Sequence, residues 1–225
     1  MSSDAFTGEE TTVAKGLTRE RLVGAALAIV DRDGLEALSM RRLGAELGVD
    51  PMAAYRHLPN KEALLDGVLE AVVSQIDLTV DESRPWPEQL RRIVNADLAV
   101  LLAHPNALPL VARRPLTTPT SMRLVEAALA ITSSAGIPRH EAILAINTMG
   151  LLVTGLATAM TAASTDAPSS EEIRERFAAL PREELPEVVS AVESGETIES
   201  FEQILEFWFG ALIARLEAAR VTPPS

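Results

Sequence analysis

Residues 38–70 read LSMRRLGAELGVDPMAAYRHLPNKEALLDGVLE and hold the clearest local pattern in this chain of 225 residues. Ser39 is a good N-cap for a short helix over 40–47, and Gly48 is a good stop for it. Asp50 caps a second short helix, which begins with a proline. Proline lacks a backbone N–H, and this costs no hydrogen bond at the first position of a helix, because an N–H there has no helical partner. The stretch therefore predicts two short helices around a tight turn.

These two helices must pack against each other across the turn. Gly44 is small enough for a close approach, and Gly48 can adopt the positive φ that the turn needs. The second helix has about two turns, which is too short to be stable alone. A short, solvent-facing helix held up by its neighbours is the kind of element that enters the major groove of DNA, so the pattern predicts a helix-turn-helix. The apolar side chains expected between the two helices are Leu43, Leu47, Val49 and Ala54.

Helical spacing of apolar residues continues through the rest of the chain. Thr18 caps a helix that runs to Asp33, and Asn60 caps another over 61–76. Residues 77–87 are polar and contain proline, which predicts a break. Further helices are expected at 88–103, 106–113, 119–135, 139–163 and 198–219, with a short one near 171–179. No alternating strand pattern is present, so the expected fold class is all-α.

Composition excludes several kinds of site. The chain has no cysteine, which rules out disulfides, thiolate zinc sites and cysteine nucleophiles. The three histidines (His57, His104 and His140) are too dispersed to suggest a metal cluster, and His104 and His140 are expected to cap or pack. A G-x-S-x-G motif, a P-loop and helical clusters of His, Asp and Glu are also missing. We therefore expect a protein that is not an enzyme and that carries no metal or other cofactor.

Charge and hydropathy limit the partners and the location. A net charge of −12 argues against indiscriminate coating of nucleic acid but leaves room for a small basic docking surface. The N-terminus, MSSDAFTGEETT, is polar and acidic, unlike a signal peptide. The longest apolar segment, 142–163, contains Asn147 and four threonines, so we expect a buried helix there instead of a membrane span. These features predict a cytoplasmic protein without a membrane partner.

The stretch from Leu17 to Glu70 resembles the tetracycline-repressor (TetR) family of one-component regulators. The resemblance is carried by the run RRLGAELGV, by Tyr55 followed by His57, and by PNKEALLDGV. Weaker matches to the C-terminal class of the family lie at Trp86, 99–106, 139–163 and the final helix. The resemblance implies a dimeric repressor that binds operator DNA and releases it when a small molecule binds. Repression in preference to activation rests on this resemblance alone.

The resemblance also implies a division into units and a DNA-binding surface. Residues 1–16 are expected to be a flexible tail, 17–76 a helix-turn-helix domain built as a three-helix bundle, and 77–225 a ligand-binding and dimerisation domain. The side chains implied in DNA contact are Arg41 and Lys61 at phosphates, Pro51, Met52 and Ala53 at base edges, and Tyr55, Arg56 and His57 at the backbone and flanking bases.

Elementary chemistry agrees with this surface and leaves alternatives open. Residues 39–61 include four basic side chains and two acidic ones, which gives this segment a local charge of +2 in a protein of net charge −12. Met52 and Ala53 bring no hydrogen-bonding groups, so base reading would use contact with thymine methyl groups and Arg56. Three alternatives stay open: Tyr55 as a packing residue, Arg41 and Arg42 as an ordinary solvated face, and His57 as a capping or packing residue.

The last helix has more apolar surface than packing on its own lobe needs. Helix 139–163 shows the same excess, and the resemblance implies that the two helices pair with their copies in a homodimer. A deep core within one chain is the alternative. The apolar residues of the last helix are Phe201, Ile204, Leu205, Phe207, Trp208, Phe209, Leu212, Ile213 and Leu216.

The effector is expected to be small and largely apolar. Tetracycline repressors hold a drug–magnesium chelate through a histidine where this chain has Leu110 or Val111, and their asparagine and aromatic residue correspond to Ile93 and Asp97. We therefore expect an effector other than tetracycline. The ligand residues expected are Ile93, Leu101, Leu108, Val111, Met122, Met149 and Leu152, with Asp97, Arg114, Glu126 and Asn147 as polar groups. For Asn147, a place at the dimer seam is the alternative.

An activator, or a helical ligand-binding protein that no longer touches DNA, also remains possible from the sequence.

Overall fold

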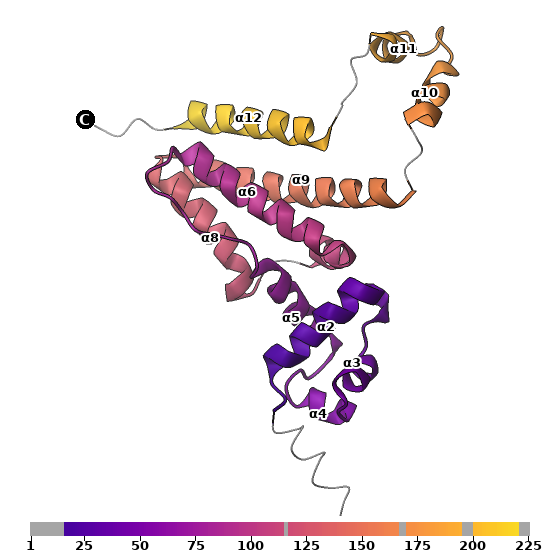
Figure 1. Ribbon diagram of the computed structural model, residues 1–225. Coiled ribbons are helices and arrows are strands. Elements are labelled where there is room, and N and C mark those ends of the chain that lie inside the picture. The colour runs from indigo at the N-terminus through magenta and orange to yellow at the C-terminus, as the bar shows by residue number, and fades with distance from the viewer. Residues whose placement is uncertain (1–15, 115–116, 167–169, 195–199, 221–225) are drawn as a thin grey trace, which may run out of the picture.

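The structure is a computed structural model that describes residues 16–114, 117–166, 170–194 and 200–220. Over these ranges the chain forms helices joined by turns, without a strand, which confirms the all-α fold class (Figure 1). The expected N-terminal tail lies outside the described residues, except for Gly16.

Four helices form an N-terminal head. They are α2 (Arg19–Asp33), α3 (Met40–Leu47), α4 (Pro51–Tyr55) and α5 (Lys61–Val73), with a 3-10 turn, η1 (Leu35–Ala37), between the first two. The predicted caps are confirmed, because the side chains of Thr18, Ser39, Asp50 and Asn60 each accept a hydrogen bond from a backbone N–H of the first turn.

Helix α5 ends at Val73, three residues before the end that the sequence pattern predicted. The N–H groups of Gln75 and Ile76 bond to carbonyls three residues back, at Val72 and Val73, so the chain tightens and leaves the α-helical pattern. The Ser74 hydroxyl also bonds to the Ala71 carbonyl and competes with a further helical turn.

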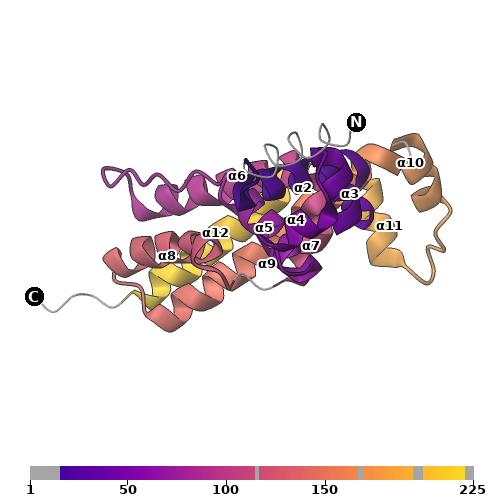
Figure 2. The same cartoon turned by 90° about the horizontal axis from the view of Figure 1, so that it is seen from below.

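The remaining helices form a second lobe. They are α6 (Trp86–Ala103), η2 (Pro105–Ala107), α7 (Leu108–Arg113), α8 (Pro119–Ser134), α9 (Arg139–Asp166), α10 (Ser170–Ala178), α11 (Pro186–Glu193) and α12 (Phe201–Ala219). Helices α6, α8 and α12 each pack against α9, with α8 oblique to it, whereas α10 and α11 form an arm at one end of the lobe (Figures 1 and 2). Helix α11 was not predicted. The expected start of the last helix at residue 198 lies outside the described residues; the described helix is capped by Ser200.

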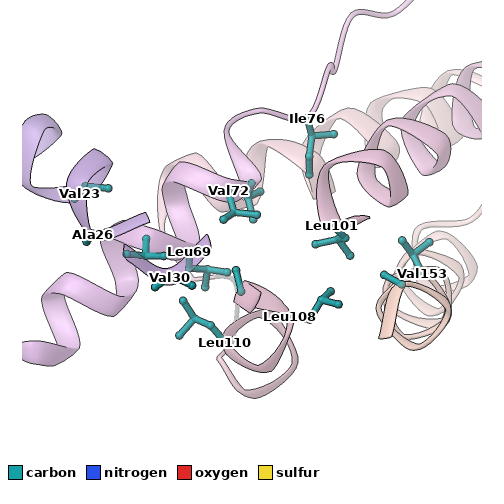
Figure 3. Close-up of a cluster of buried hydrophobic side chains, with 14 of the residues drawn as sticks. Val23, Ala26, Val30, Leu69, Val72, Ile76, Leu101, Leu108, Leu110 and Val153 are labelled. Carbon is teal, nitrogen blue, oxygen red and sulfur yellow. The ribbon is translucent and has the colours of Figure 1, made fainter. Parts of the chain in front are cut away.

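One hydrophobic core runs through both lobes. Figure 3 shows Val30 of α2 and Val72 of α5 on the head side, close to Leu108 and Leu101, with Val153 of α9 beyond them. The predicted domain boundary after residue 76 falls three residues after the end of α5, directly after Ile76, which belongs to this shared core. A change in α6 or α7 can therefore reach the head through direct packing.

Helix α9 is less buried than its sequence suggested. The span Arg139–Ala162 is long and apolar enough to cross a membrane, with a mean hydropathy of 1.7, and 28% of its most apolar window is buried. The prediction of a buried helix is wrong for the single chain, because Ile143, Leu144 and Leu151 are exposed. The face of α9 that carries these side chains points away from the helices that pack on α9, and no element of the described chain packs on it.

Candidate functional site

The turn between α3 and α4 brings the two helices into close contact. Gly48 has φ 65°, in the left-handed region that favours glycine. A Cβ atom on Gly44 would lie 2.9 Å from the carbonyl oxygen of Val49, so a larger residue would push the turn away. Leu43 and Ala54 are fully buried between the helices. This geometry confirms the predicted helix-turn-helix.

Helix α4 is supported from one side and open on the other. Ala54 anchors it in the core, whereas Met52 is 68% exposed and Tyr55 is 40% exposed. Arg56 and His57, which follow directly, are exposed as well. Figure 1 shows α4 at the end of the head that is farthest from α12. The residues predicted to face bases thus lie at an accessible tip, and Pro51 and Ala53 are half-buried beside them.

The basic residues around α4 fall into two kinds. Arg41, Arg56 and Lys61 are exposed, and none of them forms an ion pair within the described part of the chain. Their charges are therefore available to an external anion such as a phosphate.

Arg42 instead belongs to a network that ties α2 to α3. Its guanidinium lies 3.0 Å from a carboxylate oxygen of Asp33, and Arg32 lies 3.1 Å from Glu46. Hydrogen bonds from Arg32 hold the pKa of Asp33 and of Glu46 below their usual values. For Arg42 the structure thus favours the alternative of an ordinary solvated face.

A cavity lies within the second lobe, between α6, α8, α9 and α12. Its volume is about 70 Å³. The side chains that line it are almost entirely apolar. The lining residues are Leu90, Ile93, Val94, Asp97, Leu124, Ala128, Thr132, Ala145, Ile146, Met149, Gly150, Phe209, Leu212 and Leu216.

Asp97 is the one ionisable residue in this lining. Burial raises the pKa of its carboxyl from 3.8 to about 6. The other polar lining residue, Thr132, is satisfied by its own helix, since its hydroxyl lies 2.9 Å from the Ala128 carbonyl oxygen. Within the described residues the Asp97 carboxylate has no hydrogen-bond donor or cation as a partner, so the cavity combines an apolar wall with one unmatched acid.

The structure brings together three of the predicted ligand residues and places the others elsewhere. Ile93, Asp97 and Met149 line the cavity. Leu101 and Leu108 are buried in the core between the lobes, and Val111 and Leu152 pack partly against that core. Met122 and Glu126 are exposed on α8.

Asn147 and Arg114 have protein partners instead of a place in the cavity. The Asn147 side chain is exposed, and its amide donates to the Ile143 carbonyl of the same helix at 2.8 Å. Arg114 pairs with Glu62 at 2.6 Å and with Asp66 at 2.5 Å, both on α5. Neither position supports the expected grouping with Ile93 and Asp97.

Several residues that line the cavity were not predicted, although their helical spacing places them on one face with residues that were. Leu90 and Val94 precede Asp97 by seven and three positions and share its face of α6. Phe209, Leu212 and Leu216 form a similar stripe on α12, which was assigned to dimerisation as a whole. Helical spacing could have added Leu90 and Val94 to the predicted ligand residues of α6, but it could not show that α12 lines the same cavity.

The second lobe touches the head through polar contacts as well as through the core. The His104 ring, at the end of α6, lies 2.9 Å from Asp31 of α2 and 3.1 Å from the Gln75 side chain. The Asn106 amide donates to the Asp31 carbonyl at 2.9 Å. Together with the Arg114 pairs, these contacts join the end of α6, η2 and the residue after α7 to α2, to α5 and to the turn after α5.

A large apolar surface remains uncovered on α9 and α12. Leu151 is 78% exposed and Phe207 is 73% exposed, and Leu144 and Trp208 are exposed near them in sequence. Exposed apolar residues gathered on two neighbouring helices are typical of a protein–protein interface.

Comparisons with known proteins extend over both lobes. Residues 22–68 match the profile of bacterial regulatory proteins of the tetR family, and residues 80–218 match the tetracyclin repressor-like C-terminal domain. An HTH-type transcriptional regulator of Saccharopolyspora erythraea is 31% identical over 171 residues, which are 73% of this chain and 72% of that protein. The HTH-type transcriptional repressor DrrR1 of Streptomyces coeruleorubidus is 36% identical over 142 residues, 63% of this chain and 53% of that protein.

Solved structures of ActR from Streptomyces coelicolor have the same fold. Apo ActR has a TM-score of 0.79 and 28% identity, over 90% of this chain and 98% of that chain. ActR in complex with actinorhodin has a TM-score of 0.80 and 26% identity, over 90% of this chain and 97% of that chain.

Proposed function

Because this chain belongs to the tetR family of bacterial regulatory proteins, we propose that it is a dimeric transcriptional repressor that binds operator DNA through α4 and releases it when a small molecule fills its cavity. The observation that carries the proposal is the exposed tip formed by α4, flanked by the exposed cations Arg41, Arg56 and Lys61, which have no acidic partner among the described residues.

DNA binding by this tip follows from its shape and charge. Arg41 and Lys61 would contact phosphates, which fix the position of the head on the duplex. Pro51, Met52 and Ala53 would face the base edges, with Tyr55, Arg56 and His57 beside them. Met52, at 68% exposure, supports apolar contact with thymine methyl groups. The acidic remainder of the protein would limit binding to this local surface.

Dimerisation would place two such tips on one duplex. The uncovered apolar faces of α9 and α12 support pairing with the same helices of a second copy. Two recognition helices about 34 Å apart can enter successive major grooves on one side of DNA. A cytoplasmic location, where the DNA lies, follows from this function.

Ligand binding would act on the head through α6. The cavity of about 70 Å³ is smaller than the roughly 300–1,000 Å³ of small-molecule sites, so a ligand must move its walls apart. Movement of α6 would displace His104 and the contacts with Asp31 and Gln75. The ligand would thus favour a spacing of the two heads that does not match DNA. ActR, solved with actinorhodin, is a relative of this chain in which a ligand is bound.

The effector would differ from tetracycline. The positions that correspond to the drug-binding asparagine and aromatic residue of tetracycline repressors are Ile93 and Asp97, and both line the cavity. An acid and an aliphatic side chain offer different contacts from an amide and an aromatic ring.

The experiment is to select operators from random duplex DNA with the full chain, and then to measure affinity for the selected site as a function of salt. We expect Arg56→Ala and Lys61→Ala each to weaken binding about tenfold, and Lys61→Ala to reduce the salt dependence by about one charge. Arg139→Ala is the matched control, because Arg139 is an exposed cation at the start of α9. Failure to enrich any sequence, or equal affinity of the Arg56 and Arg139 variants, would overturn the proposal.

A further inference from the structure

We infer that the cavity takes an apolar molecule with one protonated amine, and that the carboxylate of Asp97 binds this amine. The inference rests on the proposed ligand-binding function of the second lobe and names the chemical class of the ligand. No comparison or family profile carries this assignment. It follows from the lining of the cavity and from what surrounds Asp97.

The wall of the cavity selects an apolar body. Leucine, isoleucine, valine, alanine, methionine and phenylalanine side chains form it, together with Gly150. The buried hydroxyl of Thr132 bonds to its own helix and offers nothing further as a donor. A ligand that fills this space gains from removal of apolar surface from water and finds one polar anchor.

The two arginines of α6, Arg91 and Arg92, have partners other than Asp97. Arg91 lies over the ring of Phe209, 4.3 Å from its centroid, and pairs with Glu206 of α12. Arg92 pairs with Asp77 at 2.6 Å. The helix that carries the acid therefore does not supply its counter-charge, and burial is the one cause that raises the pKa of Asp97.

A positively charged group on the ligand compensates the charge of the Asp97 carboxylate better than a neutral or an anionic group does. The Asp97 carboxylate is partly buried and is unpaired within the described residues, which is unfavourable for its charge, and a protonated amine supplies both a donor and an opposite charge. With a pKa of about 6 the carboxyl is largely ionised at neutral pH, so a neutral body would leave the charge uncompensated. An anionic ligand would be repelled.

The test uses three probes with one body, namely 4-phenylbutylamine, 4-phenylbutanol and 4-phenylbutyrate, in titration calorimetry of the full chain at neutral pH. We expect the amine to bind about tenfold more tightly than the alcohol, and the acid to bind most weakly. Asp97→Asn should remove the preference for the amine. Glu88→Gln, which removes an exposed acid from the same helix, should keep it.

Two results would overturn the inference. One is a wild-type chain that shows no preference for the amine, whether it binds the three probes equally or binds none of them. The other is an Asp97→Asn variant that keeps the preference for the amine. Thermal unfolding checks that each variant folds. Asp97→Leu, which makes the lining fully apolar, is a second variant that should favour the alcohol over the amine.

Operator affinity measured on the same preparations separates this inference from the proposed function. A preference for the amine in a chain that binds no operator would contradict the repressor and support the cavity assignment. Operator binding by a chain without that preference would overturn the cavity assignment and leave the repressor standing.

Discussion

Asp97 gives the cavity a measurable dependence on pH. Burial raises the pKa of its carboxyl from 3.8 to about 6, so the folded chain holds this proton more tightly than the unfolded chain. The contribution to stability is therefore full below about pH 4 and is lost as the pH rises through about 6, by up to about 3 kcal/mol. Asp97→Asn should match the wild type in stability at low pH and exceed it at neutral pH. Urea unfolding at a series of pH values measures the difference.

Asp81→Asn is the control with the opposite sign. Hydrogen bonds from Ser83 lower the pKa of Asp81, so its contribution to stability is present at neutral pH and is lost as the pH falls. The Asp81 variant should be less stable than the wild type at neutral pH. A stability difference for Asp97→Asn that stays constant from acidic to neutral pH would contradict a raised pKa of this carboxyl in the folded chain.

Single residues could be predicted from the sequence where their role is local. Thr18, Ser39, Asp50 and Asn60 cap helices through bonds to residues two or three positions away, and spacing along the chain is enough to identify them. The two partners of Arg114, Asp66 and Glu62, lie 48 and 52 residues away in sequence, on α5, and no local rule points to them. Helical spacing identifies an apolar stripe but not the neighbour that it faces.

At the scale of elements, Arg114 is the clearest ionic link between the two lobes. It joins the residue after α7 to two acids of α5, and its side chain is 21% exposed. Arg114→Ala should leave Glu62 and Asp66 close together without a counter-charge and weaken the head by about 1 kcal/mol. Hydrogen exchange should then be roughly fivefold faster at the amides of α5.

The matched control for this link is Arg182→Ala, which removes an ion pair with Glu193 on the α10–α11 arm. This variant should leave exchange in α5 unchanged. Equal exchange rates in α5 for the wild type and Arg114→Ala would exclude a role of this contact in holding the lobes together.

Two helices with proline in the first turn, α6 and α11, were predicted poorly, whereas α4 and α8, which also begin with proline, were predicted with the right first residue. The expected start of α6 at residue 88 is two residues late, because Trp86 and Pro87 were included in the break. Helix α11 begins at Pro186, in a segment rich in proline, serine and glutamate, and it was not predicted. Proline fits the first turn of a helix as well as it breaks an interior, so the residue alone does not separate the two cases.

At the scale of the whole molecule, the uncovered apolar faces of α9 and α12 predict a dimer. Leu151→Glu combined with Phe207→Glu would place charges in the interface, so we expect the wild type to sediment as a dimer and the double variant as a monomer. Val80→Glu is the control, because Val80 is an exposed apolar residue in the junction between the lobes. A double variant that stays dimeric with its helical content intact would place the interface elsewhere.

The arrangement of lobes could be predicted in outline but not in detail. The head and the helical second lobe follow from helix spacing and from the break at 77–87. The shared core between them joins residues from distant segments, such as Val30, Val72 and Leu108, which belong to one buried cluster. The excess apolar surface of α9 was visible in the sequence, but its exposure in the single chain required the structure.

Hydroxyl-radical footprinting of the full chain on a selected operator tests most directly whether two copies of α4 read DNA together. We predict two protected regions, centred about 10 base pairs apart on one face of the duplex and related by two-fold symmetry, which Arg56→Ala weakens equally at both. Protection of a single asymmetric region, or a symmetric pattern that the Arg56 variant reproduces at full strength, would contradict DNA recognition by paired α4 helices.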